Sequence, residues 1–455
     1  MNRRSSRLAA VAAVLLLGLL GSGLTPVGAR AAVDPGPHAA KTPIRHLVVM
    51  TQDQHSFDSY FGTRPGVDGL PTGVCLPVRK GSLAPCVKPF RLKGSGLHLP
   101  LLSTKPVQST SIHDGRMDGF VYAQSARTKA GRMAMGYYSR SDLPVLNEIA
   151  DHAVLFDHWF TSVQGGSIQN RLFAVSGRST TDQAEVPVDG WQGIPLIFDR
   201  LQAAHVSWRI YVENYEPALT ITTAGPKARR GGQVARVPVL ATPRFANDPK
   251  LAAHVVDLSR YYADLAAGTL PAVSYVVSTS ATEHPPTDPT SGQVLTRTVL
   301  NALAESSSWT SSALLLNYDT AGGWYDHVAP PVEDGTVLGP RVPALLVSPY
   351  ASPGAVNHAE FSSASTLKFI EHNWTVAPLT RRDRDATDLS TAFSFKQPPR
   401  AASLLGARDG RPPLVRPSSP VIYVAYLLAV LVVGMAVAWV IASERRRHVV
   451  RVEPT

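Results

Sequence analysis

The stretch IRHLVVMTQDQHSFDSYFG, residues 44–62, decides the expected fold of this chain. Its apolar run at residues 46–50 is short and passes directly into polar residues, which is typical of a strand buried on both faces. Similar short runs follow along the chain, at residues 154–156, 273–277, 313–316 and 344–347. Polar or glycine-rich turns bound these runs, so we predict the strands of a largely parallel sheet.

Helical patterns lie between some of these strands. Ser141 is expected to cap a helix that has Asp142 in its first turn. The apolar face of this helix would consist of Leu143, Leu146, Ile149 and Ala150. Ser365 is expected to begin another helix, whereas residues 60–110 and 215–250 are expected to form long loops or lids. The alternation predicts an α/β fold in which helices cover both faces of the sheet.

The composition is that of a globular protein with ample material for a core. The chain has 455 residues, of which 44% are hydrophobic and 17% charged, and no block repeats at a fixed period. Its formal net charge is +10, but much of this charge lies near the two ends. The remainder is too dilute to indicate a nucleic-acid partner.

Residues 1–31 have the pattern of a secretory signal peptide. Three arginines precede an apolar run at residues 8–20, and Ala-Arg-Ala at 29–31 offers a cleavage site. An uncleaved anchor helix is the alternative. The paired arginines at positions 3 and 4 leave twin-arginine export open beside the general secretory route.

The other end of the chain predicts a membrane anchor. Residues 421–442 carry no formal charge and are long enough to span a bilayer, which requires roughly 20 apolar residues. The basic tail at residues 443–455 should remain cytoplasmic, so the domain at residues 32–410 should be extracytoplasmic. Residues 411–420, rich in proline and serine, would form a stalk. We therefore predict a single-pass protein of the plasma membrane, with a buried core helix as the alternative for the span.

Cys75 and Cys86 are the only cysteines. Outside the cytoplasm they could close a local disulfide loop, and two free thiols are the alternative.

Polar side chains follow two of the predicted strands. Asp53 and Gln54 come after the first, and Asp319 and Thr320 come after the strand at residues 313–316. Ligands of α/β folds bind at the carboxyl ends of strands, although each acid taken alone could simply cap a turn or a helix. Two such strand ends and a serine beside paired glycines favour a functional site.

Seven motifs in order resemble the bacterial phosphoesterase family of phospholipases C and AcpA-type acid phosphatases, over residues 43–395. They are IRHLVVMTQDQHSFDSYFGTRPGVDG from Ile44, HDGRMDGF from His113, YYSRSDLPVLNEIADHAVLFDHWF from Tyr137, SVQGGSIQNRLF from Ser162, EHPP from Glu283, NYDTAGGWYDHVAPP from Asn317 and RVPALLVSPY from Arg341. The resemblance implies an alkaline-phosphatase-like fold: a three-layer sandwich with a mostly parallel central sheet, to which this chain adds one C-terminal transmembrane helix.

The resemblance also implies roles for individual residues. Ser167 would be the nucleophile, and one divalent metal ion, of undetermined identity, would activate it. The implied metal ligands are Asp53, Gln54, Asp319 and Thr320. The implied phosphate contacts or proton donors are His113, His284 and His327. The implied substrate-binding residues are Gly166, Asn170 and Arg171, since paired glycines let the backbone approach an anion closely.

The sequence departs from the family pattern in the metal ligands. Asp53 stands where the family has Glu, Gln54 where it has Asn, and Thr320 where it has a second carboxylate. Fewer anionic ligands bind a hard cation more weakly.

From the motifs and the predicted membrane segments together, we expect a membrane-anchored hydrolase of phosphoric esters, acting on a phosphate ester that could be a phospholipid. The alternative is a catalytically inactive surface binding protein of the same family.

Overall fold

A computed structural model describes residues 39–406, apart from 83, 93–99, 126–130, 180–181 and 285–287, together with residues 431, 434–435 and 438–439. The predicted signal peptide, stalk and cytoplasmic tail lie outside the described residues, as does most of the predicted span at 421–442. Within the described part of the chain, no helix is both long enough and apolar enough to cross a membrane.

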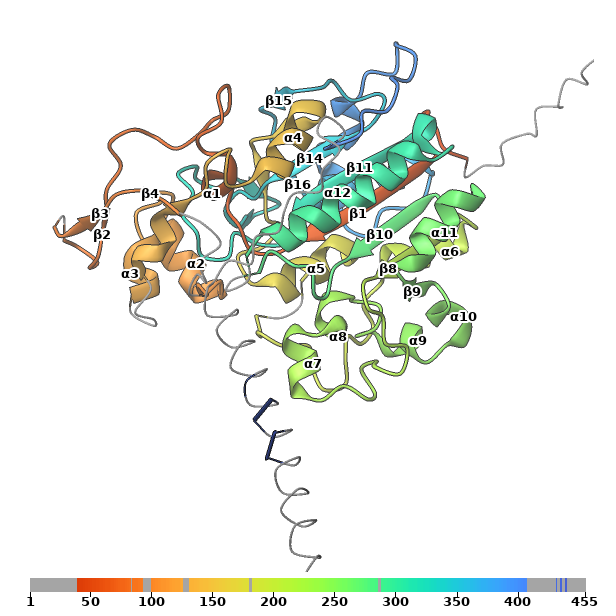
Figure 1. Ribbon diagram of the computed structural model, residues 1–455, viewed down its shortest axis with the longest axis horizontal. Helices are drawn as coiled ribbons and strands as arrows, with labels where there is room; N and C mark the ends of the chain where they lie inside the picture. The colour runs from red at the N-terminus through yellow and green to blue at the C-terminus, as the bar shows by residue number, and fades with distance from the viewer. Residues whose placement is uncertain are drawn as a thin grey trace, which may run out of the picture. The chain divides into compact units, whose positions relative to one another are not determined.

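The centre of the domain is a large sheet (Figure 1), which has eight strands among the described residues. In chain order they are β1 (His46–Gln52), β6 (Val154–Phe156), β8 (Trp208–Val212), β9 (Val255–Asp257), β10 (Val273–Val277), β11 (Ser312–Tyr318), β14 (Ala344–Val347) and β15 (Ala355–Asn357). Their order across the sheet is β15-β6-β14-β11-β1-β10-β8-β9. Only β14 among them runs antiparallel to its neighbours, β11 and β6. The predicted, largely parallel sheet is therefore confirmed.

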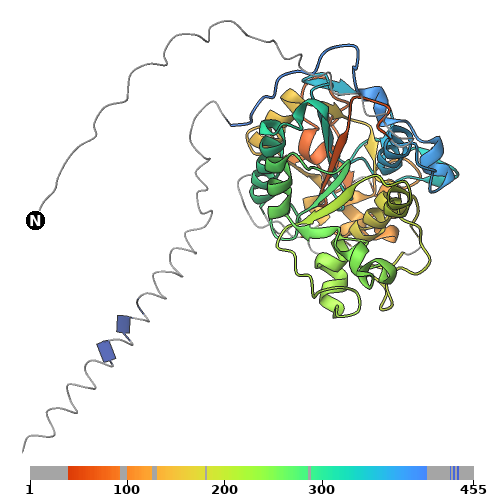
Figure 2. The same ribbon diagram turned by 90° about the vertical axis from the view of Figure 1, so that its right-hand side faces the viewer.

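Helices on both faces bury this sheet, which explains why its central strands are mostly apolar. The longer helices are α2 (Lys105–Ile112), α4 (Pro144–His152), α5 (Ser167–Ser176), α6 (Ile197–Ala203), α11 (Ser259–Ala267), α12 (Thr290–Glu305) and α13 (Ser363–Asn373). On one face α12 contacts α4 and α11, and on the other α5 contacts α6 and α13. Figure 2 shows the teal α12 and the blue α13 on opposite sides of the sheet. All seven residues of β11 are buried as a result.

Shorter elements complete the domain. The short helices are α1 (Phe57–Phe61), α3 (Phe120–Ser125), α7 (Pro226–Gly231), α8 (Gln233–Arg236), α9 (Pro243–Ala246), α10 (Pro249–Ala252), α14 (Arg381–Asp385), η1 (Gly131–Met135), η2 (Trp309–Ser311) and η3 (Leu389–Ala392). The two-residue strands are β2 (Leu76–Pro77), β3 (Cys86–Val87), β4 (Phe90–Arg91), β5 (Gly136–Tyr137), β7 (Trp159–Phe160), β12 (Val332–Glu333), β13 (Thr336–Val337) and β16 (Phe361–Ser362). Residues 215–250, predicted to form long loops or lids, contain the short helices α7, α8 and α9 and the start of α10, so the expectation of loops was wrong there. The predicted disulfide between Cys75 and Cys86 is present and ties β2 to β3.

Two predicted helix starts were also wrong. The first helix begins at Pro144 rather than after Ser141, because the fixed φ of proline suits the first helical position. Ser141 instead accepts a hydrogen bond from Arg91 Nη2 (2.8 Å). The other helix, α13, begins at Ser363 with Ser362 as its cap, and Ser365 accepts from the Ser362 N–H to close a capping box.

Candidate active site

The register of β1 and β11 brings the predicted acids together. Gln52 lies opposite Tyr318 in this parallel pair, so Asp53 and Asp319 leave the sheet side by side at the same edge. Ser167 is the first residue of α5, and Gly166 before it has an extended backbone without a side-chain cap. The start of α5 therefore exposes uncapped N–H groups at the same edge, a setting that suits an anion.

A cavity of about 460 Å³ lies at this edge of the sheet. Six of the eleven predicted site residues line it: Asp53, Gln54, Gly166, Ser167, Arg171 and His284. Asp319 lies behind Arg171, and Asn170 is buried below the turn before α5. Its Oδ1 accepts from the Val163 N–H (3.2 Å), and its Nδ2 donates to the Gly166 carbonyl (3.3 Å), so Asn170 holds that turn.

Two arginines neutralise the acids of the site. Arg171 donates from Nε to Asp319 Oδ2 and from Nη2 to Asp53 Oδ1, both at 2.8 Å. Arg236 donates from Nη1 to Asp53 Oδ1 (2.9 Å) and Oδ2 (2.8 Å). The Gln54 N–H donates to Asp319 Oδ1 (3.2 Å). Both oxygens of each carboxylate therefore accept hydrogen bonds.

The electrostatics of the two carboxylates differ. Burial would raise the pKa of the Asp53 carboxyl, but the charges of Arg236 and Arg171 outweigh it and lower that pKa to about 2. For Asp319, burial and the charge of Asp53 raise the pKa although Arg171 opposes them. The arginines thus keep Asp53 ionised in a buried position.

Gln54 connects the acids to the predicted nucleophile. Its Nε2 donates to Ser167 Oγ at 3.4 Å, and its backbone is left-handed, with φ of 52°. Asn adopts the left-handed conformation more readily than Gln, which gives a backbone reason why the family has Asn at this position. An amide takes up no proton, so Gln54 orients the Ser167 hydroxyl without activating it.

The Thr320 hydroxyl forms hydrogen bonds with residues other than the predicted metal ligands. Its Oγ1 accepts from Gln108 Nε2 (3.0 Å) and donates to the Gly165 carbonyl (3.1 Å), so it braces the loop before Ser167. The four predicted ligands therefore do not fit a divalent ion as they stand. Arginines pair with both carboxylates, and the Thr320 hydroxyl is hydrogen-bonded to Gln108 and Gly165.

Behind His284, the structure reveals a buried acid that the sequence analysis did not single out. Tyr60 and Tyr318 both donate to Glu283 Oε2, at 2.7 Å each. Burial raises the pKa of Glu283 to about 8, against the two tyrosine hydrogen bonds, which lower it. Glu283 lies within the EHPP motif, so the motif carried the signal, but only the structure shows the burial.

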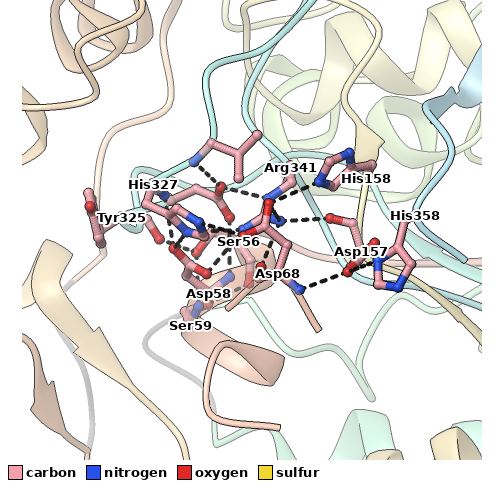
Figure 3. A network of polar contacts seen from close by, with 12 residues as sticks. Ser56, Asp58, Ser59, Asp68, Asp157, His158, Tyr325, His327, Arg341 and His358 are labelled. Atoms are coloured by element: carbon pink, nitrogen blue, oxygen red, sulfur yellow. Dashed lines mark hydrogen bonds and ion pairs between the residues drawn. The ribbon is translucent and has the colours of Figure 1, made fainter. Parts of the chain in front are cut away.

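His113 and His327 do not line the cavity. His113 Nδ1 pairs with Asp118 Oδ1 at 2.5 Å. His327 lies in a separate polar network (Figure 3), with Nδ1 on Asp58 Oδ2 (2.7 Å) and Nε2 on Asp68 Oδ1 (3.0 Å). Burial lowers the pKa of His327, but the hydrogen bond and charge of Asp58 reverse this and raise it overall. These placements favour structural roles for both histidines, whose predicted roles at phosphate stay predictions.

The same network contains a group that could hold a metal ion. Ligand atoms of Asp58, Asp326 and His327 lie within 4.8 Å of one another. Arg341 already supplies positive charge there, with Nε on Asp326 Oδ1 (2.8 Å) and Nη2 on Asp58 Oδ1 (3.1 Å). A metal ion at this place would therefore compete with a buried guanidinium group.

Arg236 is the main site residue that sequence reasoning missed. It ends α8, 183 positions after Asp53 in the chain, within the basic stretch that had been expected to form a loop. Arg236 lies outside the seven family motifs, so the basic composition of residues 215–250 was the only sequence signal for it.

The fold and the site define an α/β protein with an arginine-lined polar cavity at the carboxyl edge of its sheet. A family model described as the Phosphoesterase family matches residues 44–377, and the chain belongs to this family. The resemblance found in the motifs is thereby confirmed, and family membership indicates a hydrolase acting on phosphoric esters.

Curated relatives agree with this assignment. The chain is 29% identical over 428 residues to the non-hemolytic phospholipase C of Pseudomonas aeruginosa, which covers 79% of this chain and 58% of that relative. It is 29% identical over 434 residues to phospholipase C B of Mycobacterium tuberculosis, which covers 79% of each. Among solved structures, a protein of the alkaline phosphatase superfamily from Vibrio parahaemolyticus is 12% identical. The match covers 68% of this chain and 74% of that one, with a TM-score of 0.36.

Proposed function

We propose that this protein hydrolyses phosphoric esters of the phospholipase C type, with Ser167 as the nucleophile. The observation that carries the proposal is the convergence of the Ser167 hydroxyl, the start of α5 and two arginines on one cavity at the carboxyl edge of the sheet. Backbone N–H groups and guanidinium groups are donors to phosphoryl oxygens. The relatives named phospholipase C support a phosphodiester substrate, including a phospholipid.

The expected chemistry has two halves. Ser167 Oγ forms a bond to phosphorus as the bond from phosphorus to the departing oxygen breaks, and the hydroxyl proton ends on the departing alkoxide. His284 lies on the cavity wall, where an imidazole can carry this proton. Water then attacks the phosphoserine, which releases phosphate or a phosphomonoester and restores the hydroxyl.

The sequence also predicted a divalent ion at Asp53 and Asp319. Such an ion supplies a Lewis acid for the phosphoryl oxygens and the nucleophile. Arg171 and Arg236 occupy the carboxylates in the present arrangement, which does not fit such an ion. Neither of the two reaction steps depends on it.

Turnover by the purified chain tests the proposal. We expect hydrolysis of p-nitrophenyl phosphate, its choline-phosphate diester or phosphatidylcholine, and a loss of at least about 10³-fold in kcat for Ser167→Ala. Ser280→Ala is the matched control because Ser280 lines the same cavity but its hydroxyl accepts from Asn214 Nδ2 (2.9 Å), so its kcat should stay near the wild-type value. Equal activity of Ser167→Ala and wild type on every substrate would refute the role of Ser167.

A catalytically inactive binding protein is the second candidate, and the arginines on Asp53 and Asp319 favour it. The two candidates differ in one measurement. A binding protein would bind inorganic phosphate in the cavity, weakened by Arg236→Gln, without turning over any of the esters.

We also propose an extracytoplasmic location, with residues 421–442 as a membrane anchor. The sequence pattern supports it, as does the Cys75–Cys86 disulfide, which is typical of oxidising compartments. In intact cells, protease should digest the domain while the basic tail stays protected. Recovery of the whole chain in the carbonate-soluble fraction would contradict the anchor.

A further inference from the structure

The two arginines of the site are held in different ways. Arg171 belongs to α5, a layer of the core, and its side chain is 5% exposed. Arg236 ends the four-residue helix α8 and reaches Asp53 from the cavity wall, with its side chain 11% exposed. Arg236 is therefore the partner of Asp53 that can leave with the smaller disturbance of the core.

The other contacts of Arg236 are weaker than its contact with Asp53. Its Nε donates to the Gly231 carbonyl at 3.4 Å and its Nη1 to the Ser278 carbonyl at 3.3 Å, against 2.8 and 2.9 Å to the Asp53 oxygens. Asp53 thus provides the main anchor of this side chain.

The charge balance of the site follows from these contacts. Asp53 and Asp319 carry two negative charges, and Arg171 and Arg236 carry two positive charges within hydrogen-bond distance. A divalent cation at Asp53 would lie beside two guanidinium groups in a buried place, where like charges repel strongly. If Arg236 leaves, Asp53 Oδ2 loses its guanidinium partner while Oδ1 keeps its hydrogen bond from Arg171, and the two carboxylates face a single positive charge.

We propose that Arg236 occupies the cation position at Asp53 and competes there with a divalent metal ion. Metal binding then requires Asp53 to exchange the guanidinium group for the ion. This role of Arg236 rests on the proposed function and adds to it. In a chain with Thr320 in place of an acid, the guanidinium group of Arg236 compensates the buried negative charge of Asp53. The competition concerns ion affinity, so it can be tested in a chain without the nucleophile.

The test is a titration of Mn²⁺ into the full chain carrying Ser167→Ala, followed by calorimetry and by the Mn²⁺ paramagnetic resonance signal. Adding Arg236→Gln should raise the Mn²⁺ affinity at least about tenfold, because the competing charge is gone. Arg230→Gln is the matched control. Arg230 lines the same cavity, but it pairs with Glu185 and its side chain is 67% exposed, so its removal should change the affinity by less than about twofold.

Two further variants locate the ion. Asp53→Asn should abolish the gain produced by Arg236→Gln, whereas Asp58→Asn should leave the gain intact, which separates this position from the group around His327. Equal Mn²⁺ affinity with and without Arg236→Gln would overturn the proposal, as would a gain that survives Asp53→Asn.

Arg236→Ala covers the case in which Arg236→Gln does not fold. Alanine also removes the competing charge, so a similar gain in Mn²⁺ affinity over the Ser167→Ala chain is expected, and an unchanged affinity contradicts the proposal. A wild-type chain that turns over no ester would refute the proposed function, whereas the Mn²⁺ affinities of the Ser167→Ala chains would still test the role of Arg236.

Discussion

At the residue scale, Glu283 shows how burial sets protonation beside the cavity. Its Oε2 accepts from two tyrosine hydroxyls, while its Oε1 has no hydrogen-bond partner among the described residues. The buried carboxyl therefore favours its neutral form, and its pKa rises from 4.5 to about 8. Protonated Glu283 would keep negative charge away from the cavity proposed to bind phosphate esters.

This predicts a pH-dependent stability. Because the folded-state pKa is raised, the folded protein holds a proton that the unfolded chain releases, so stability falls as pH rises from about 4.5 to about 8. Glu283→Gln removes this titration, and its stability relative to wild type should grow by a few kcal/mol between pH 5 and pH 8. Urea unfolding at several pH values measures it, with exposed Glu305→Gln as the control; parallel curves for wild type and Glu283→Gln would contradict the prediction.

At the element scale, capping decides where helices begin. The Ser362 hydroxyl accepts from the Ala364 N–H (3.2 Å) and starts α13, which packs on α5, the helix that carries Ser167. The cap is local, but the helix it starts supports the site through packing.

Removing this cap should destabilise the domain moderately. We expect Ser362→Ala to lower the free energy of unfolding by about 1 kcal/mol, because an N–H of the first turn loses its acceptor. Ser362→Gly should cost only a few tenths of a kcal/mol, since glycine tolerates the cap position. Chemical denaturation of the three chains checks this, and a Ser362→Ala chain as stable as wild type would show that the hydroxyl contributes little.

At the scale of the whole molecule, Arg341 links distant segments through buried charge. Besides Asp58 and Asp326, it donates to the carbonyl of Asp68 (2.9 Å) and to that of Asp157 (2.7 Å), as Figure 3 shows. The network connects α1 with the loops after β6 and β11, so it holds segments far apart in sequence against one edge of the sheet.

Breaking this network should be costly. Arg341→Met leaves Asp58 and Asp326 buried without their cation, and we expect a loss of about 3–5 kcal/mol in the free energy of unfolding. Arg381→Met, which removes a surface partner of Asp334, should cost less than about 1 kcal/mol. Thermal and urea unfolding compare the two, and similar losses would mean that the buried charges are compensated in another way.

Much of the fold could be predicted because its signals are local. All five predicted strands are present, since a strand covered on both faces is apolar at most of its positions, and that pattern is visible in the sequence. The convergence of Asp53 and Asp319 could also be expected, because the carboxyl ends of neighbouring parallel strands share one edge. Helix starts were less predictable, since Ser141 and Pro144 both offer a start and proline is the better first residue.

The sequence by itself determined the buried strands, the Cys75–Cys86 pair and the motifs of the Phosphoesterase family, because each depends on residue type and order along the chain. Only the tertiary structure decided that Arg236 reaches Asp53 and that Thr320 turns towards Gly165. The physical reason is that charge compensation and hydrogen bonding depend on distances of a few ångströms between segments far apart in sequence, which no local pattern encodes.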